Sequence, residues 1–328
     1  MILSRAPTRV TLGGGGTDLK SYYSKHGGFL IAGAIDKYCT ILASRRFYNS
    51  IQVSYSQMEV RDKVADIEHR IFRAALELTG LEKGIELHSA ADVPANCGLG
   101  TSSSFTVALL NALHTYGKDF ITQEQLAEEA CHIEIDLLGE PIGKQDQYLA
   151  AFGGLTCLTF AQNGEVLVEP LRISHQALEQ LEDNVLLFFT GKERSASEML
   201  SDQDEKCKQD DQEMTDNLHQ IKEIGLETRK YLEKGQVGMF GELLHAHWET
   251  KKKRSRGMSD PFIDECYEVA RKNGAAGGKL VGAGGGGFLM FYSDNHDKPR
   301  LVETMQKMGL RWERFRFDFD GAKVLVNA

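Results

Sequence analysis

The sequence predicts an α+β fold with two domains, and three observations support this prediction. Short β-rich runs and helical stretches are intermixed in the first half, without the regular alternation of a doubly wound α/β sheet. Long polar helices dominate the second half. The 328 residues are enough for two packed cores of ordinary size. We expect a first domain over residues 1–175 and a second over 176–328.

In the first half, apolar runs predict strands and periodic apolar positions predict helices. Phe105, Leu109, Ala112 and Tyr116 recur at helical spacing, which predicts one buried face of an amphipathic helix. The dipeptide Asn163-Gly164 predicts the turn of a hairpin. The expected strands lie at 9–12, 41–44, 51–55, 84–89, 155–160 and 166–168, and the expected helices at 66–80, 102–116 and 123–138.

In the second half, the apolar run at 184–190 predicts a strand before a series of helices. The acidic segment from Ser201 to Glu213 is typical of a solvated helix face or a mobile loop. The expected helices lie at 195–234, 236–251, 260–273 and 297–308, with a strand at 288–292 and a final strand pair near the C-terminus.

Composition limits the classes of function. The chain is 41% hydrophobic and 26% charged, as in a soluble globular protein, and no apolar run is long enough to span a membrane. Six scattered cysteines without a metal-binding spacing indicate reduced thiols in the cytoplasm. The net charge of −9 argues against nucleic-acid binding, and an anionic substrate requires a locally positive pocket. Assembly into a homo-oligomer is compatible with all of this.

The segment from Pro94 to Ser104 is the most informative in the chain. Its glycines let the backbone bend close to a ligand, and its hydroxyl residues stand where a helix leaves its first N–H groups unpaired. A turn of this kind binds phosphate, although a Gly/Ser loop with an ordinary serine cap explains the same residues. The candidate phosphate-binding residues are Pro94, Gly98, Leu99, Gly100, Thr101, Ser102, Ser103 and Ser104.

An earlier glycine run, Gly13 to Gly16, follows the strand that starts at Arg9. Arg9 before the glycines and Asp18 after them can converge on one ligand across a bare backbone. A strand, a loop and a surface ion pair are the simpler interpretation, because exposed ion pairs are common and nearly neutral in energy.

Glu134 is the one carboxylate of its predicted helix that lies among apolar neighbours, whereas Glu128, Glu129 and Asp136 project toward water. A buried carboxylate costs several kcal/mol unless it has a cation, a hydrogen-bond partner or a proton. A divalent metal meets that need, and so does an arginine or a backbone amide. The spacing does not decide between them.

Further along, Pro141 and Gly143 end the helix and place Asp146 at the start of a new segment. One carboxylate on a metal and another free to accept a hydroxyl proton suit phosphoryl transfer. Gly282, Gly284 and Gly287 formally match a dinucleotide-binding pattern, but that pattern must open a helix and a strand follows here. We expect this backbone to lie against a nucleotide or a substrate.

Together these residues resemble the GHMP kinase family, which is named for galactokinase, homoserine kinase, mevalonate kinase and phosphomevalonate kinase. The three family motifs occur in order over most of the chain, at 6–18, 94–104 and 282–288. The resemblance implies an N-terminal domain of the ribosomal S5 domain 2-like type, a ferredoxin-like C-terminal domain, and an active site between them.

The resemblance also implies the roles of single residues in a kinase that uses ATP and Mg²⁺. The loop at 98–104 would wrap the ATP phosphates, and Ser102 and Glu134 would hold magnesium. Asp146 would act as the catalytic base, and Arg9 would steady it and the developing charge. The residues implied for the substrate are Gly15, Gly16, Thr17, Asp18, Gln147, Gly284, Gly285 and Gly286.

The segments at 13–19 and 140–148 resemble a branch of the family that phosphorylates the anomeric hydroxyl of heptose 7-phosphate. In galactokinases a Glu and a His align with Gly15 and Gly16. Their absence here opens space and removes a negative charge, as a phosphorylated acceptor requires. The alternatives are another sugar 1-kinase, of the fucose or galactose type, and a non-catalytic sensor of sugar and nucleotide on the same scaffold.

Two basic segments are candidates for holding the phosphate of a sugar phosphate substrate. At 192–197 a strand ends in basic residues and a Ser-capped helix begins, so Lys192, Arg194 and Ser195 come first. The second segment, 251–256, is a basic run of a kind that is more typical of a solvated helix end.

Overall fold

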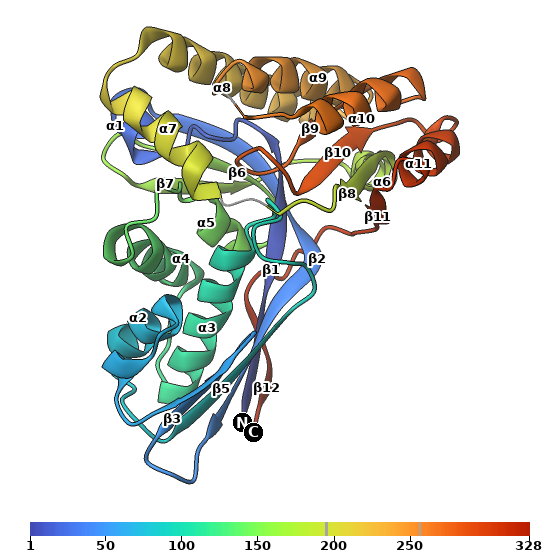
Figure 1. Ribbon diagram of the computed structural model, residues 1–328. Helices are drawn as coiled ribbons and strands as arrows, with labels where there is room; N and C mark the ends of the chain where they lie inside the picture. Colours follow the sequence, from blue (N-terminus) through green and yellow to red (C-terminus); the bar gives the residue numbers. More distant parts are fainter. Residues whose placement is uncertain (194–195, 256) are drawn as a thin grey trace.

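The computed structural model describes residues 1–193, 196–255 and 257–328, and the elements form two β-sheets with helices packed on both (Figure 1). The first sheet has the strand order β12-β1-β2-β5-β3-β4, and β6 pairs with both β2 and β7. The second sheet has the order β11-β8-β10-β9. Strands and helices are intermixed without a regular alternation, so the predicted α+β class is confirmed.

The first sheet is built on the long antiparallel pair β1 and β2, whose register runs from Ile2 opposite Ala43 to Gly13 opposite Ile31. Helices α2 to α5 cover one face of this sheet and share a continuous apolar core with it. The bounds are β1 Ile2–Gly13, α1 Lys20–His26, β2 Gly28–Arg45, β3 Ile51–Ser54, β4 Met58–Arg61, η1 Val64–Asp66, α2 Arg70–Thr79, β5 Ile85–Ala91, α3 Thr101–Gly117, α4 Gln123–Cys131, η2 His132–Leu137, α5 Gln145–Phe152, β6 Leu155–Phe160, β7 Val166–Pro170 and β12 Lys323–Asn327.

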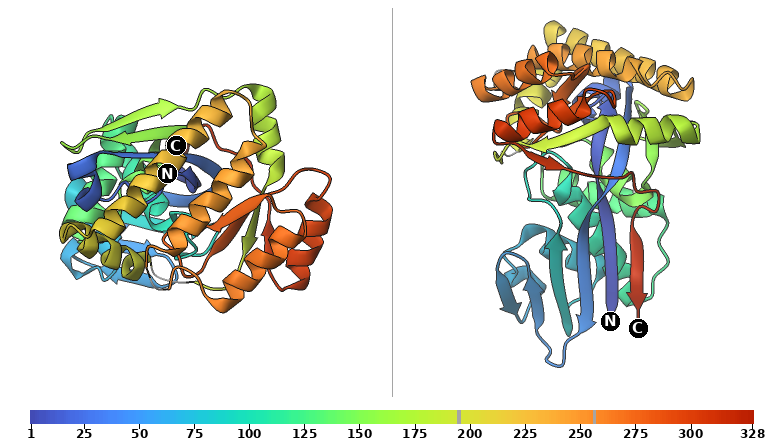
Figure 2. Two further views of the ribbon diagram at one scale, coloured as in Figure 1. Left: turned by 90° about the horizontal axis from the view of Figure 1, so that it is seen from above. Right: turned by 90° about the vertical axis from the view of Figure 1, so that its right-hand side faces the viewer.

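The second sheet packs against the first through one apolar cluster, and against α9, α10 and α11 through another. Helices α8 and α9 cross the molecule above the end of the first sheet (Figure 2). The bounds are α6 His175–Asn184, β8 Val185–Phe189, α7 Ala196–Lys208, α8 Gln212–Glu233, α9 Met239–Lys252, α10 Pro261–Lys272, β9 Gly277–Leu280, β10 Phe288–Tyr292, α11 Lys298–Lys307 and β11 Arg311–Glu313.

Most predicted elements are present, and the hairpin of β6 and β7 forms as expected. Helix α3 is buried on more than the one face that its spacing predicts, since Val107, Ala108 and Leu110 are also inaccessible. The helix expected at 123–138 ends at Cys131 and continues as the π-helix η2. Extra residues in such a turn change which side chains face inward, and π-turns are frequent at functional sites.

In the second half, the single helix expected at 195–234 is two helices. Helix α7 ends at Lys208, Asp210 has a positive φ angle of 55°, and Asp211 caps the N-terminus of α8 by accepting from the amide of Met214. Helix α6 was not predicted. The final strands do not pair with each other: β11 pairs with β8, and β12 returns to β1 in the first sheet. The division at residues 175 and 176 stays a prediction.

Two further predictions concern the chain as a whole. All six cysteines are buried and free of disulfide bonds. Among the described helices, none combines the length and the apolar character that a membrane span requires.

Candidate active site

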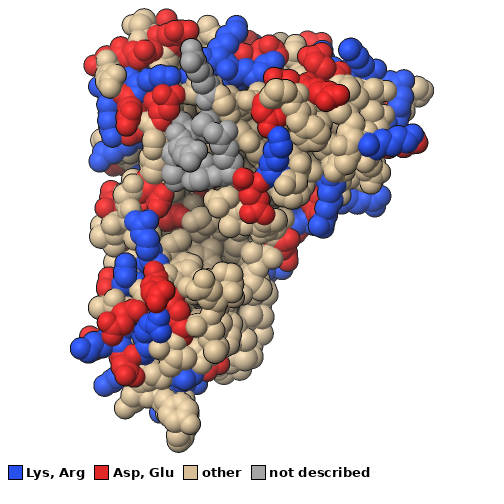
Figure 3. Space-filling model, viewed as in Figure 1, with Lys and Arg blue, Asp and Glu red and all other residues tan. Residues whose placement is uncertain are grey.

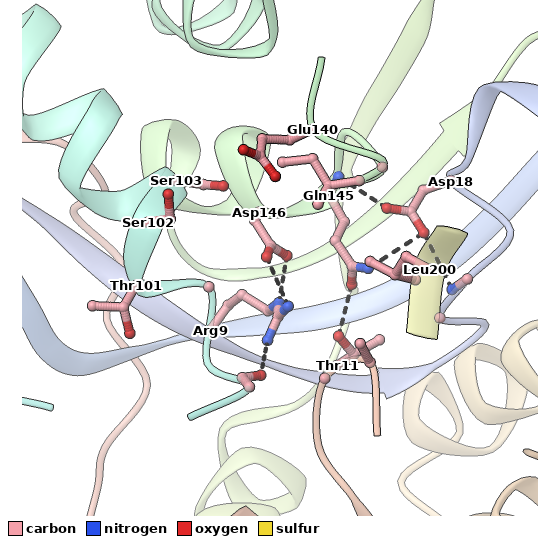
Figure 4. A pocket seen from close by; sticks show the side chains of 18 of the residues that line it. Arg9, Thr11, Asp18, Thr101, Ser102, Ser103, Glu140, Gln145, Asp146 and Leu200 are labelled. Atoms are coloured by element: carbon pink, nitrogen blue, oxygen red, sulfur yellow. Dashed lines mark hydrogen bonds and ion pairs between the residues drawn. The ribbon is translucent and has the colours of Figure 1, made fainter. Parts of the chain in front are cut away.

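A cavity of about 520 Å³ lies where the two halves of the chain meet. The first half contributes the end of β1, the glycine turn after it, the start of α3, η2 and the start of α5. The second half contributes the C-terminal part of α9, the end of β9 and the residues that follow each. Figure 4 shows the side chains that converge on this cavity from the first half.

The loop before α3 is held in a backbone conformation that favours glycine. Gly98 and Gly100 have φ angles of 85° and 75°, and α3 begins immediately after Gly100. A Cβ on Gly100 would lie 3.0 Å from the Asp146 carboxylate, so the loop passes directly beside that side chain. The first turn of α3, with Thr101, Ser102 and Ser103, therefore opens into the cavity next to Asp146.

Three predicted members of this loop, Pro94, Leu99 and Ser104, lie outside the cavity lining, and their contacts hold the loop in place. The Thr101 hydroxyl donates to the Pro94 carbonyl at 3.1 Å, and the Arg9 amide donates to the Leu99 carbonyl at 3.0 Å. The Ser104 hydroxyl donates to the Pro7 carbonyl at 2.7 Å. The contacts of Leu99 and Ser104 tie the loop and the helix start to β1, and the N-cap Gly100 offers no side chain to the first N–H groups of α3.

Arg9 and Asp146 form a two-pronged ion pair across 137 positions of sequence. Arg9 Nε donates to Asp146 Oδ1 at 2.7 Å, and Nη2 donates to Oδ2 at 2.8 Å (Figure 4). The third prong, Nη1, donates to the Gly98 carbonyl at 2.5 Å. A fork of this kind fixes the plane of the carboxylate as well as its position. The predicted pair of Arg9 and Asp146 is thus one rigid unit with the loop.

Glu134 is buried, with 1% of its surface exposed. It accepts from the Ser102 hydroxyl and from the Gln147 amide, each at 2.7 Å. Both donors are neutral side chains. Among the residues that the structure describes, neither an arginine nor a backbone amide, the two alternatives left open by the sequence, donates to the Glu134 carboxylate. Burial raises the pKa of Glu134 to about 7, although Ser102, Ser103 and Gln147 act in the opposite direction.

The surroundings of Glu134 fit a magnesium ion. Among the described residues no group of three or more His, Cys, Asp or Glu side chains forms a metal cage. Magnesium needs no such cage, because it binds through one or two protein oxygens together with phosphates and water. The Ser102 hydroxyl and the uncompensated Glu134 carboxylate are two such oxygens beside the turn at the start of α3. Gln147 is fully buried behind Glu134 and does not line the cavity.

Asp18 lies on the other side of Asp146 and is also buried. Its carboxylate accepts from the amides of Gly16 and Gln145, each at 3.2 Å. A Cβ on Gly143 would lie 1.9 Å from Asp18 Oδ2, so only glycine fits there. Burial, followed by repulsion from Asp146, raises the pKa of Asp18.

Gly15 and Gly16 line the cavity beside Asp18, as the sequence suggested. Thr17 does not line it: its hydroxyl donates to the Gly14 and Phe29 carbonyls at 2.9 Å and fixes the turn from behind.

The third glycine motif packs against protein backbone. A Cβ on Gly282 would lie 2.5 Å from Gly98 Cα, and one on Gly287 would lie 2.1 Å from the Cys97 carbonyl oxygen. Gly284 and Gly285 contact Met258, and Gly286 contacts Lys192, so the cavity lining does not include these three predicted substrate residues. The glycines of this motif therefore allow the backbone at 282–287 to pack closely against the backbone of the loop before α3.

The turn favoured for the acceptor phosphate is not at the cavity either. Lys192 is 43% exposed, pairs with Asp260 and lies over the Phe262 ring, outside the cavity lining. Arg194 and Ser195 lie outside the described residues.

The second basic segment, 251–256, differs from its expected solvent exposure. Lys251 and Arg254 are 5% and 6% exposed and line the cavity, so their interpretation as a solvated helix end is wrong. Lys279 on β9 and His247, one turn before Lys251 on α9, line the same wall. Leu244, His247 and Lys251 fall at helical spacing on a buried face, and this periodicity is the signal that could have revealed them.

Comparisons with known proteins identify the family to which the chain belongs. The family model for the GHMP kinase N-terminal domain matches residues 67–154, and the model for the GHMP kinase C-terminal domain matches residues 228–309. The D-glycero-alpha-D-manno-heptose 7-phosphate kinase of Campylobacter jejuni is 31% identical over 334 residues, which cover 98% of each chain. The chain therefore belongs to the GHMP kinase family. It is a phosphotransferase that acts on an alcohol group, and its relatives make it a sugar kinase of that family.

Solved structures give the same result for the fold. A crystal structure described as a D-glycero-D-manno-heptose 1-phosphate kinase from Bacteroides thetaiotaomicron has a TM-score of 0.83 at 27% identity and covers 100% of both chains. A sugar kinase structure from Campylobacter jejuni has a TM-score of 0.78 at 28% identity, over 98% of this chain and 97% of the other. The galactokinase of Lactococcus lactis, with a TM-score of 0.81 at 18% identity, covers 99% of this chain and 95% of its own and supports the fold alone.

Proposed function

We propose that this protein transfers the terminal phosphate of ATP to the anomeric hydroxyl of D-glycero-D-manno-heptose 7-phosphate, giving the 1,7-bisphosphate. The observation that carries the proposal is the Arg9–Asp146 unit, which faces the cavity directly beside the loop before α3. The similarity to the heptose 7-phosphate kinase of Campylobacter jejuni supports the choice of acceptor.

Asp146 is the proposed proton acceptor. The hydroxyl oxygen of the sugar bonds to the terminal phosphorus of ATP, the bond to ADP breaks, and the hydroxyl proton passes to the Asp146 carboxylate. An anomeric hydroxyl is more acidic than an ordinary alcohol, so a carboxylate is an adequate base. Arg9 holds this carboxylate at a fixed angle, and proton transfer depends on such positioning.

The N–H groups at the start of α3 and the hydroxyls of Ser102 and Ser103 are the proposed donors to the ATP phosphates. Ser102 and Glu134 would hold magnesium, which when bound neutralises charge on the phosphates. Gln147 keeps the Glu134 carboxylate pointed toward Ser102. Ser104 fixes the helix start against β1, so these donors are in place before a ligand arrives.

The sugar is proposed to lie between Asp146 and the glycine turn at 13–16. Asp18 is suited to accept from a sugar hydroxyl, because its remaining partners are backbone and amide N–H groups. The absence of side chains at Gly15 and Gly16 does not open the space that the sequence suggested, because a Cβ on Gly15 would lie 3.1 Å from Thr11 Cγ2 and one on Gly16 would lie 2.5 Å from Arg254 Nη1. The two glycines instead let Arg254 approach the acceptor side of the cavity.

The test is an acceptor screen with ATP and Mg²⁺ that follows ADP release. Heptose 7-phosphate, free heptose, mannose, fucose and galactose are compared at equal concentration. We expect the highest kcat/KM with heptose 7-phosphate. A higher kcat/KM with a free sugar would show that the acceptor is of the fucose or galactose type. Binding of the acceptors without any release of ADP would identify a sensor instead of an enzyme.

A further inference from the structure

The wall that the second half of the chain gives to the cavity carries a cluster of buried cations, Lys251, Arg254 and Lys279, which we name the basic wall. All three side chains are at most 6% exposed. On the face of the molecule in Figure 3, by contrast, acidic and basic side chains are interspersed and reach the solvent. The basic wall therefore differs from the exposed charges on that face.

The partners of the basic wall are neutral. Lys251 Nζ donates to the carbonyls of Leu280 and Gly282, at 3.0 and 2.5 Å. Lys279 Nζ lies 3.3 Å from His247 Nδ1. Arg254 donates to side-chain oxygens of Asn217 and Gln203 and, at 3.4 Å, to the Gly15 carbonyl.

No carboxylate within the described residues forms an ion pair with these three side chains. Burying a cation without a counter-charge costs several kcal/mol, and folded proteins avoid it unless a ligand supplies the charge. Lys251 and Lys279 also keep donors that these contacts do not use, because an ammonium group has three. The basic wall thus has both charge and hydrogen-bonding capacity left for an anion.

The electrostatics of the lysines agree with this geometry. Burial, with repulsion from Arg254 and Arg9, lowers the pKa of Lys251 to about 7. The pKa of Lys279 is also lowered, by burial and then by Lys251, Arg9 and Arg254. A neighbouring anion would reverse both effects by favouring the charged forms.

The basic wall reaches the acceptor side of the cavity through Arg254. Gly16 has a φ angle of 98°, and a Cβ there would lie 2.5 Å from Arg254 Nη1. The space that Gly16 leaves is therefore occupied by this guanidinium. The arginine thus lies at the glycine turn where the sugar is proposed to bind, and the loop before α3 offers separate donors to the nucleotide.

We propose that Lys251, Lys279 and Arg254 bind the phosphate group that the sugar acceptor carries. This inference rests on the proposed function, and it places the acceptor with its reacting hydroxyl at Asp146 and its phosphate at the basic wall. An uncharged hexose would leave the three cations without a partner. The wall therefore selects phosphorylated acceptors.

The experiment compares Lys251→Met and Lys279→Met with Lys253→Met, an exposed lysine of the same segment, as the matched control. KM and kcat are measured with heptose 7-phosphate, with free heptose and with ATP. A charge-assisted hydrogen bond is worth about 1.5–3 kcal/mol, so we expect KM for heptose 7-phosphate to rise about 10- to 100-fold in the first two variants. KM for ATP and kcat/KM for free heptose should stay within about twofold of the wild type.

A rise in KM for ATP in place of the acceptor would assign the wall to the nucleotide phosphates and overturn the proposal. An unchanged KM for heptose 7-phosphate would also overturn it, as would a selective loss in Lys192→Met. Failure of the wild-type enzyme to use heptose 7-phosphate at all would count against the proposed function. In that case inorganic phosphate still tests the wall.

Inorganic phosphate should raise the Tm of the wild type and of Lys253→Met, because a ligand that binds the folded state stabilises it. Lys251→Met should lose most of this shift, and an undiminished shift would overturn the proposal. Both buried variants should remain folded, because replacing an uncompensated buried charge by an apolar side chain is commonly neutral or stabilising. A Tm without ligand at or above that of the wild type checks this directly.

Discussion

The wall of the cavity built by β1, α3, η2 and α5 and the wall built by α9 and β9 both carry charged side chains, but their charges are compensated differently. In the first wall, Asp146 has a cationic partner in Arg9, although Asp18 and Glu134 accept hydrogen bonds from neutral donors. In the second wall, Lys251 and Lys279 have only neutral partners. The carboxylate proposed as the base thus has its counter-charge within the protein, whereas we propose that a ligand supplies the counter-charge of the second wall. In this proposal the first wall performs the chemistry and the second selects the substrate.

The largest effect is expected in the first wall. Asp146→Asn removes the proton acceptor but keeps the shape of the side chain, so kcat should fall by about 10² to 10⁴ while KM for ATP stays nearly unchanged. Steady-state kinetics with heptose 7-phosphate measures both. Asp62→Asn, at an exposed position, is the control. Near-normal turnover of Asp146→Asn would remove this residue from the proposed mechanism.

The link between the two walls is expected to have the next largest effect. Gly16→Ala places a Cβ against Arg254 at a positive φ angle, so it should displace the guanidinium. We expect KM for heptose 7-phosphate to rise by about 10-fold or more, from the loss of a charge-assisted contact. Gly80→Ala is the matched control, because it has a φ angle of 66° and open space around it. Gly80→Ala should lower the stability of the protein without changing KM for heptose 7-phosphate. If Gly16→Ala and Gly80→Ala have the same KM, Arg254 does not contribute to binding of the acceptor.

Glu134→Gln tests a buried carboxylate of the first wall whose described hydrogen-bond donors are neutral. The folded-state pKa of Glu134 is about 7, above the ordinary value of 4.5, so the folded protein keeps a proton that the unfolded chain releases. Wild-type stability is therefore lost as pH rises from about 4.5 to 7 and is lowest above that range.

Without metal, the glutamine variant should be more stable than the wild type by on the order of 2 kcal/mol at pH 8, and by nothing at pH 4. It should also need more Mg²⁺ for activity. Urea unfolding at the two pH values and a magnesium titration measure these effects. A pH-independent difference in stability, together with an unaltered magnesium titration, would indicate a purely structural Glu134.

The smallest expected effect concerns pH and the second wall. Lys251 faces His247 on its own helix, Arg254 just after it, Lys279 on β9 and Arg9 on β1, and its pKa is lowered to about 7. It therefore loses its proton as pH rises above 7. KM for heptose 7-phosphate should then increase by at most about 10-fold per pH unit, while KM for free heptose does not follow. In Lys251→Met this part of the pH profile should be absent, and its persistence would point to another group.

Much of the first wall could be predicted from the sequence, because its residues stand in short glycine-rich motifs whose geometry is local. The sequence could not show that Gln147 turns inward to Glu134, since Gln147 lies on α5, a separate helix whose orientation to η2 depends on the irregular segment 138–144 between them. It also could not show that Gly282 meets Gly98, a contact between backbones far apart in the chain.

The second wall was harder to predict for a physical reason. A basic run at the end of a helix is usually solvated, and only the packing of α9 against β9 turns Lys251 inward. The strands β11 and β12 show the same limit, because their partners β8 and β1 lie far away in sequence. Local propensity gives the type of an element but not its neighbour.

The backbone junction between the two glycine loops has a mechanical consequence. Lys251 donates to the Gly282 carbonyl, and Gly282 lies directly against Gly98 in the nucleotide loop. An anion that binds the Lys251 ammonium therefore changes its hydrogen bond to the Gly282 carbonyl. Gly282 is in contact with the loop before α3, where ATP is proposed to bind. Interiors are close-packed, so such a change is transmitted and not absorbed. We therefore expect occupancy at one end of the cleft to influence the other weakly and, by linkage, mutually, within the twofold change in KM for ATP that is expected for Lys251→Met.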